Sequence, residues 1–145
     1  MKALTSIKTL AAAALTALSL TAASAPAYAG SESNVSGSIS IGIQGSTPEE
    51  KQAIANGLFL YALFQGLQGD DAMLRQLGNG NAAGIMQGGD ANFGLVEQHG
   101  DNHTGTLNQQ GNGNAFGLFQ FGEGTEAHVN QTGNGEGGLL FQFGF

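Results

Sequence analysis

The sequence contains no cysteine and few charged residues, and both shortages limit what the protein can be. A chain of 145 residues without cysteine must be stable without disulfides, in whatever compartment it works. Four lysines and arginines stand against 11 aspartates and glutamates, and beyond residue 29 only Lys51 and Arg75 are basic. Such an acidic chain lacks the basic surface that nucleic acids and anionic membranes require. We therefore expect no nucleic-acid partner.

Groupings of residues that could form an active site or a metal site are also missing. No nucleophile elbow, phosphate-binding loop or metal-binding helix motif is present, and the acidic residues are spread along the repeats. His99 and His103 flank Asp101, but a third and a fourth fixed ligand are lacking. We expect no enzymatic activity, no metal, no cofactor and no small-molecule substrate. We interpret the acids in the turns as groups that slow premature association.

The first 29 residues have the pattern of a signal peptide. Lys2 and Lys8 precede an apolar run over residues 9–23, and Ala27-Tyr28-Ala29 forms a small-x-small cleavage site. The run is too short, and too closely followed by the cleavage site, to make a good transmembrane helix. An uncleaved anchor is the less favoured alternative. We expect a secreted protein whose mature chain begins at Gly30.

The next part of the chain contains two elements outside the repeats. A Ser/Gly-rich segment spans residues 30–46, and within it residues 38–43 alternate like a short strand. A helical segment follows over residues 47–69, with Thr47 as N-cap and Pro48 in the first turn. Its apolar part is too short to cross a bilayer. We hypothesise that this helix covers an apolar sheet face or caps the first rung before assembly. Its acidic flanks disfavour the alternative of membrane-surface binding.

Residues 70–145 contain an 11-residue repeat. Of the 25 glycines, 18 lie after residue 75, and they recur at fixed positions. Glutamine marks the repeat at Gln76, Gln87, Gln98, Gln109, Gln120, Gln131 and Gln142. Glycine follows two residues later at Gly78, Gly89, Gly100, Gly111, Gly122, Gly133 and Gly144. An aliphatic residue lies two before each glutamine and a mostly small one four before, which is the period-2 pattern of one face of a strand.

Short segments rich in Asn, Asp and Gly separate the predicted strands and favour chain reversals, so the glycines are interpreted as turn glycines. Antiparallel hairpins fit the spacing locally, but the fixed period favours a strand–arc–strand coil. We predict an all-β fold, a β-solenoid of 11-residue units with two units per coil, preceded by one short α-helix. Residue i then stacks on residue i+22.

This stacking gives the glutamines a structural role. Identical amides repeated every ~4.8 Å along an axis can hydrogen-bond to one another in a ladder. Buried amides without partners are costly, so the ladder requires that the register be kept. We predict that all seven glutamines point inward and form such a ladder.

The residues on the opposite face of each strand distinguish two sheets. Units that end at Gln87, Gln109 and Gln131 present mostly polar residues outward, whereas the other units present more apolar ones. Phe119 and Phe141 lie 22 residues apart, as do Phe121 and Phe143, and both pairs are predicted to stack on the apolar outer face.

Three units share a fuller pattern, with asparagine five residues after the glutamine at Asn81, Asn92 and Asn114. The other units keep glutamine and glycine but carry His103, Thr125 or Glu136 in place of the asparagine. The pattern Gln-x-Gly-x-x-Asn-x-(small)-x-x-x-Gln resembles the curlin repeat, over residues 74–145.

The resemblance implies a subunit of curli, the functional amyloid of bacterial biofilms, either the major fibre subunit or a minor nucleating one. It implies export through the periplasm by a dedicated outer-membrane pore with chaperones, and a cell-surface fibre that contains this chain and other curlin-type subunits. It also adds the three asparagines to the predicted ladder.

The predicted strand edges favour polymerisation without the resemblance. Residues 142–145 are in phase with the repeat and are followed by no polar cap, which predicts an open rung that another molecule can join. We predict a secreted structural subunit that assembles end to end into an extracellular cross-β fibre for biofilm matrix and adhesion. The alternative is a monomeric secreted β-solenoid that serves as a binding or adhesion module. A regular threonine array on one flat face would favour that alternative, and the sequence has none.

Overall fold

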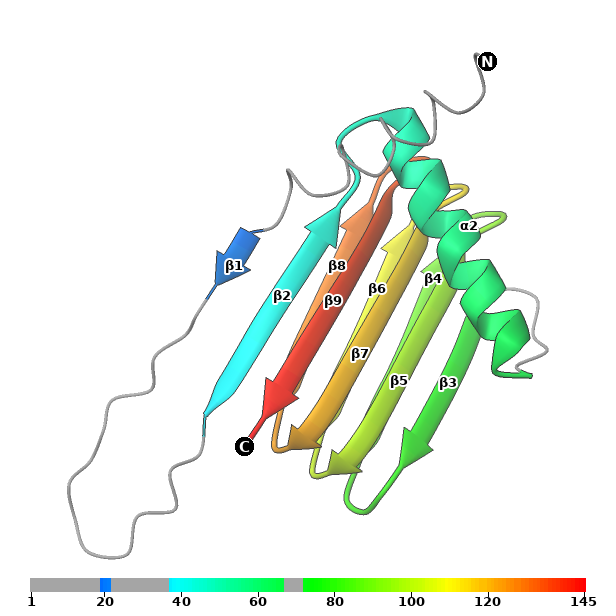
Figure 1. Ribbon diagram of the computed structural model, residues 1–145. Helices are drawn as coiled ribbons and strands as arrows, with labels where there is room; N and C mark the ends of the chain where they lie inside the picture. The colour runs from blue at the N-terminus through cyan, green and yellow to red at the C-terminus, as the bar shows by residue number, and fades with distance from the viewer. Residues whose placement is uncertain (1–18, 22–36, 67–71) are drawn as a thin grey trace, which may run out of the picture.

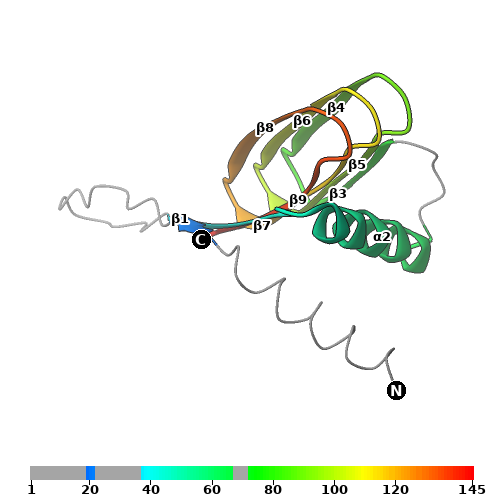
Figure 2. The same cartoon turned by 90° about the horizontal axis from the view of Figure 1, so that it is seen from above.

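The computed structural model describes residues 19–21, 37–66 and 72–145, and its repeats form a β-solenoid of stacked coils (Figures 1 and 2). The elements are β1 (Ser19–Thr21), β2 (Ser38–Gln44), α2 (Pro48–Phe64), β3 (Ala72–Leu77), β4 (Ala82–Gly88), β5 (Phe93–Asp101), β6 (Thr104–Gln110), β7 (Ala115–Glu123), β8 (Glu126–Thr132) and β9 (Gly137–Gly144). The predicted signal peptide lies outside the described residues except for β1.

Two sheets form the opposite walls of the solenoid. One has the order β1-β2-β9-β7-β5-β3, and the other has the order β4-β6-β8. The chain changes sheet at every 11-residue unit, and the repeat strands within each sheet are parallel with residue i paired to residue i+22. The predicted β-solenoid and its 22-residue coil are therefore confirmed.

Aliphatic residues and glutamines fill the space between the sheets. Val96, Leu107 and Leu118 are buried and form one apolar cluster, with the glutamine of each strand beside them. In the units other than that of β7, a small residue makes room for these side chains, whereas the β7 unit has Phe116 at that position. A Cβ on Gly105, for example, would lie 2.5 Å from Oε1 of Gln120.

Most of the predicted turn glycines have the left-handed backbone that a reversal needs. Positive φ angles of 90–138° occur at Gly78, Gly89, Gly100, Gly111, Gly122 and Gly133. A larger residue would be strained there, and a Cβ on Gly111 would also overlap the carbonyl oxygen of Gly133 in the next coil. Gly144, the last residue of β9, differs from the other six because its φ is not in the positive range.

Helix α2 begins as the sequence predicts and ends earlier. Thr47 is the N-cap, and its side chain accepts from the backbone N–H of Glu50, whose carboxylate accepts from the N–H of Thr47 in return. The helix ends at Phe64, and Gly66 follows with a φ of 69°. Part of the predicted helical segment, residues 67–69, lies outside the described residues.

The helix packs on the outer face of the six-stranded sheet (Figure 1). Leu58 and Ala62 are buried there in a cluster with Met73, Leu95 and Phe119. This is the face that the sequence predicts to be apolar. Of the two places hypothesised for the helix, the covered sheet face is the one observed.

Strand β2 covers an edge that we expected to be open. It pairs antiparallel with β9 along its whole length, from Ser38 opposite Gly144 to Gln44 opposite Gly138, and β1 pairs with β2 in turn. The prediction of an uncovered last rung is therefore wrong for this sheet. The physical reason is cross-strand packing, because the alternating isoleucines of β2 lie opposite Phe143, Phe141 and Leu139 and extend the apolar outer face.

Candidate assembly interface

Two columns of glutamine amides run through the interior along the solenoid axis. In the six-stranded sheet the Nε2 atoms of Gln76, Gln98 and Gln120 donate to the next glutamine of the column at 2.8–2.9 Å, ending at Gln142. In the other sheet Gln87 donates to Gln109 and Gln109 to Gln131, both at 2.8 Å. The predicted glutamine ladder is confirmed at all seven positions. Every donation points toward the C-terminal coil.

Five of the seven amides also bond across the interior, at Gln98, Gln109, Gln120, Gln131 and Gln142, which the sequence did not reveal. The second hydrogen bond of Nε2 reaches the backbone carbonyl oxygen 16 residues earlier, on the opposite sheet. The pairs are Gln98 to Ala82, Gln109 to Phe93, Gln120 to Thr104, Gln131 to Ala115 and Gln142 to Glu126, at 3.0–3.4 Å. Among the described residues, no buried side-chain nitrogen or oxygen lacks a partner. The glutamines therefore connect successive coils and also connect the two sheets.

The asparagines predicted to extend the ladder bond to backbone instead. The Nδ2 atoms of Asn81, Asn92 and Asn114 donate to the carbonyl oxygens of Gly100, Gly111 and Gly133 at 2.8–2.9 Å. Their Oδ1 atoms accept from the backbone N–H groups of His103, Asn114 and Glu136 at 3.0–3.1 Å. The prediction of an asparagine amide ladder is wrong. The asparagines lie where the chain reverses, and there the backbone groups of the next coil need partners.

Asn81 stacks at 22-residue spacing under His103 and Thr125, which take the place of asparagine in the next two coils. Nδ1 of His103 lies 2.8 Å from Oγ1 of Thr125, and Nε2 of His103 lies 3.2 Å from the carbonyl oxygen of His99. Both side chains are buried. The imidazole of His103 is therefore held inside the solenoid. Within the described part of the chain, no three His, Cys, Asp or Glu side chains are grouped as a metal site.

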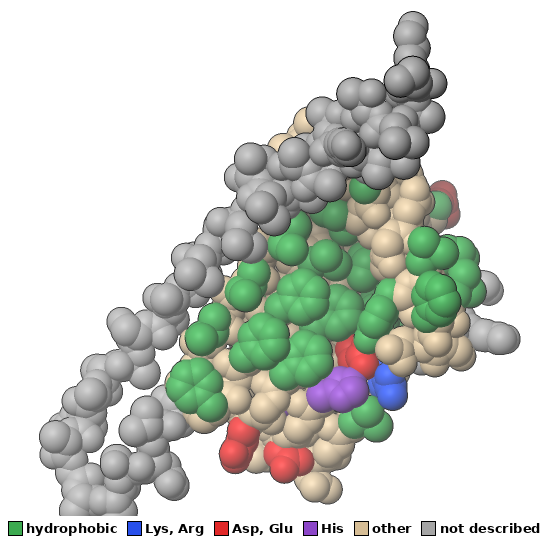
Figure 3. All heavy atoms as spheres, in the orientation of Figure 1, with side chains coloured by type: hydrophobic (Ala, Val, Ile, Leu, Met, Phe, Trp, Pro, Cys, Tyr) green, Lys and Arg blue, Asp and Glu red, His purple; other side chains and the backbone are tan. Residues whose placement is uncertain are grey.

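The outer face of the six-stranded sheet carries the predicted aromatic stacks. The rings of Phe119 and Phe141 are 4.9 Å apart at 11°, and those of Phe121 and Phe143 are 5.3 Å apart at 16°. Tyr61 of α2 covers Phe119 edge-on, whereas Phe143 is 40 % exposed. Figure 3 shows the apolar side chains of this face gathered into one patch beside the helix.

A polar cluster centred on the buried Glu97 anchors α2 to this face, and the sequence analysis missed it. The carboxylate of Glu97 accepts from the Tyr61 hydroxyl at 2.6 Å and from Arg75 at 3.2 Å, and it also contacts Nε2 of His99. Burial, together with the hydrogen bond to Glu97, raises the pKa of Tyr61 to about 12. A signal was present, because Arg75 and Glu97 are opposite charges 22 residues apart, at the stacking distance of the repeat.

The two ends of the solenoid differ. At the first coil, Leu74 is 45 % exposed, although Val96 and Leu118 above it in the same column are fully buried. At the last coil, Gln142 has no further glutamine above it, and its Nε2 lies 3.2 Å from Oγ of Ser40 in β2. The interior is thus open at the first coil and partly closed by β2 at the last.

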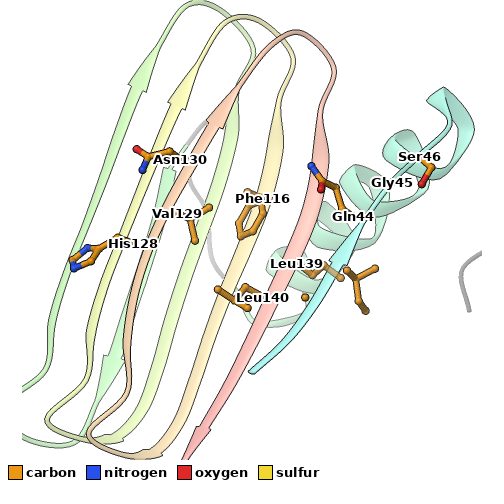
Figure 4. A pocket seen from close by; sticks show the side chains of 11 residues that line it. Gln44, Gly45, Ser46, Phe116, His128, Val129, Asn130, Leu139 and Leu140 are labelled. Carbon is orange, nitrogen blue, oxygen red and sulfur yellow. The ribbon is translucent and has the colours of Figure 1, made fainter. Parts of the chain in front are cut away.

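A groove of about 720 Å³ lies beside β8 at the last coil (Figure 4). It is lined by His128, Val129 and Asn130 of β8, Leu139 and Leu140 of β9, Phe116 of β7, and residues 42–46 at the end of β2. In the described residues β8 has no sheet neighbour other than β6. The groove therefore lies where the next strand of the three-stranded sheet would pair.

Comparisons with known proteins identify no relative, so the functional argument starts from the geometry described above. No protein-family model matches the chain, and no curated protein or solved structure is found to be similar to it. Among the described residues, no helix is long and apolar enough to cross a membrane. The candidate interface consists of the two glutamine columns, the open edges of the first coil and the groove beside β8.

Proposed function

We propose that this chain is a secreted structural subunit that assembles end to end into an extracellular cross-β fibre of the curli type. The observation that carries the proposal is the repetition of one interior from coil to coil, with the same register at every junction. A surface that stacks on itself within the chain is also suited to stack between chains. Within the described residues, β3 and β4 are edge strands, and the first coil presents such a surface uncovered.

The exposed interior of the first coil gives a driving force for stacking. Another coil placed on it would bury Leu74 and bring a donor to the Oε1 atom of Gln76. Burial of the exposed part of one leucine contributes about 1 kcal/mol, and the new strand pairs add backbone hydrogen bonds along both sheets. Both contributions favour elongation at this end.

The resemblance of the repeats to curlin supplies the biological setting of the proposal. In that setting the signal peptide directs the chain to the periplasm, and a dedicated outer-membrane pore with chaperones delivers it to the cell surface. There it forms fibres with itself and with other curlin-type subunits, in the biofilm matrix and in adhesion. The acidic turn residues Asp90, Asp101 and Glu123 keep single molecules apart by charge repulsion before they meet a fibre end, whereas Glu136 is paired with Lys51 at 2.8 Å.

A monomeric solenoid that binds or adheres to another surface is the second candidate. The observation that favours it is β2, which pairs with β9 and closes one edge of the solenoid within the molecule. Natural solenoids use such caps to remain monomeric. The two candidates therefore differ in whether β2 stays on β9.

Fibre formation in solution tests the proposal. A chain that begins at Gly30, refolded at micromolar concentration, is expected to form unbranched fibres visible by electron microscopy. Their X-ray diffraction should show a meridional reflection at about 4.7–4.8 Å and an equatorial one near ~10 Å. A monodisperse monomer that persists, also after seeding with sonicated material, would contradict the fibre and favour the monomeric module.

A further inference from the structure

We infer that successive copies in the fibre are related by a half turn about the solenoid axis. In this arrangement β3 of the next copy occupies the groove beside β8, and β4 of that copy pairs with β9 in place of β2. The inference rests on the proposed function and specifies its partner, a second copy of this chain, and the register of the contact.

The number of repeat strands leads to the half turn. The seven strands β3 to β9 alternate between the sheets, so that the six-stranded sheet contains four of them and the three-stranded sheet contains three. The strand that would follow β9 at the same 11-residue step belongs over β8, in the groove. In a continuous stack, this position goes to the first repeat strand of the next copy. That strand is β3, and it would then lie in the wall opposite to the one it occupies in its own molecule.

Stacking without rotation meets two obstacles. If β4 of the next copy entered the groove, β3 of that copy would fall on the place already taken by β9. If β3 were placed on β9 instead, the groove would stay empty and the edge of β8 would remain unpaired inside the fibre. Unpaired backbone groups within a stacked core are costly. Only the half turn fills both positions.

The inward faces of the two walls are similar enough to be exchanged. Both walls repeat an aliphatic residue and a glutamine at every second position, preceded by a small residue in every unit except that of Phe116. In the half-turn register, Leu74 of the next copy lies over Val129, and Gln76 of the next copy lies over Gln131. The glutamine column of the three-stranded sheet then continues from Gln131 to Gln76 of the next copy, and that of the six-stranded sheet continues from Gln142 to Gln87 of the next copy. Every amide nitrogen still donates in the same direction.

The groove also explains how docking can start while β2 is in place. The edge of β8 is unpaired in the described structure, and β2 lies against β9 and forms only one side of the groove. The first strand of the incoming copy can therefore pair with β8 first. Its second strand then replaces β2 on β9, and Gln87 of the incoming copy takes over the bond that Ser40 now accepts from Gln142.

Engineered cysteine pairs test the half turn, because the chain has no cysteine of its own. Stacked residues of neighbouring strands lie roughly 4.8 Å apart, within the range of about 4.4–6.8 Å that a disulfide spans. In the half-turn register Thr132 lies next to Leu77 of the next copy, and Phe141 next to Met86 of the next copy. Without rotation, Phe143 lies next to Leu77. All these side chains point outward, and within one molecule each pair is far apart.

The double variants Thr132→Cys/Leu77→Cys, Phe141→Cys/Met86→Cys and Phe143→Cys/Leu77→Cys are assembled under reducing conditions, checked by electron microscopy, oxidised and dissolved in denaturant. We expect a non-reducing gel to show a ladder of covalent multimers for the first two variants and monomer for the third. A ladder for the third variant, or monomer for all three from well-formed fibres, overturns the half turn but leaves the fibre standing. Failure of the parent chain to form any fibre removes the proposed function itself. Two independent pairs are used so that a folding defect in one variant does not decide the outcome.

Discussion

At the scale of single residues, an inward glutamine makes two kinds of contact that no aliphatic side chain can make. Gln109 accepts from Gln87, donates to Gln131 and also donates to the carbonyl oxygen of Phe93 across the interior. Each bond contributes only about 1 kcal/mol net, but its loss would leave buried groups unpaired at a higher cost. The ladder therefore discriminates strongly against any change of register.

Replacement of Gln109 by lysine should destabilise the fold and block assembly. Gln109 is fully buried, so Gln109→Lys places a charge in the stacked interior and removes the amide that joins Gln87 to Gln131. We expect a loss of about 3 kcal/mol or more in the free energy of unfolding, measured by denaturant titration with circular dichroism.

Gln110 offers a matched control for this prediction. It is the next residue in the same strand, its side chain is exposed, and it bonds only to Asn108 on the outer face. Gln110→Lys should change the unfolding free energy by no more than about 0.5 kcal/mol and should leave fibre growth intact. If the two lysine variants lost the same amount of unfolding free energy, the inward glutamine column would contribute no more to stability than an exposed position.

Tyr61 gives a second prediction at this scale, in alkaline solution. Its pKa rises from 10.0 to about 12 in the folded chain, because burial and the Glu97 carboxylate oppose the phenolate. Below pH 10 the phenol is neutral in both the folded and the unfolded chain, and the folded state keeps its full stability. Between pH 10 and about 12 the unfolded chain loses the phenol proton first, so the free energy of unfolding falls as the pH rises. Tyr61→Phe should remove this part of the pH dependence, measured as the slope of unfolding free energy against pH.

In a chain that begins at Gly30, Tyr61 is the sole tyrosine. The ultraviolet absorbance of tyrosinate then reports its ionisation directly, in the folded and in the unfolded chain. A folded-state midpoint at the ordinary value near 10 would contradict the contact with Glu97.

At the scale of elements, the segments before the repeats cover surfaces that the repeats leave open. Helix α2 buries Leu58 and Ala62 on the outer face, and β2 adds its isoleucines to the same face while pairing with β9. Both contacts join regions far apart in the sequence. The repeats therefore fold with a cover made from residues that carry no repeat themselves.

A disulfide between β2 and β9 should stop elongation reversibly. Ile39 and Phe143 are paired across these strands and both are exposed, so that Ile39→Cys/Phe143→Cys can be oxidised in the monomer. Because β2 is part of the same chain, it competes with the incoming strand for β9 at an effective concentration on the order of millimolar, and the disulfide prevents its release from β9. We therefore expect elongation of preformed seeds to slow by at least about tenfold.

Reduction should restore the elongation rate of this variant, measured by seeded growth in a dye-binding assay. The same oxidising treatment of the single variant Ile39→Cys is the control. Equal growth with and without the disulfide would mean that β2 stays on β9 in the fibre, and the half-turn register would then fail for β4.

At the scale of the whole molecule, the sequence predicts most of the solenoid and little of what lies against it. The 11-residue period, the inward glutamines and the stacked phenylalanines follow from repetition, because a repeated pattern leaves one geometry that satisfies all units. The antiparallel place of β2 and the Glu97 cluster depend on contacts between segments of unlike sequence. No repeated spacing in the sequence predicts these contacts, except that Arg75 and Glu97 lie 22 residues apart.

The one-way donation of the glutamine columns makes the molecule electrically directional. Each column presents an amide oxygen at the first coil, on Gln76 and Gln87, and an amide nitrogen at the last coil, on Gln131 and Gln142. The amide dipoles therefore add along the axis instead of cancelling. Two molecules that met head to head would set oxygen against oxygen, so a filament built from this unit has two chemically different tips.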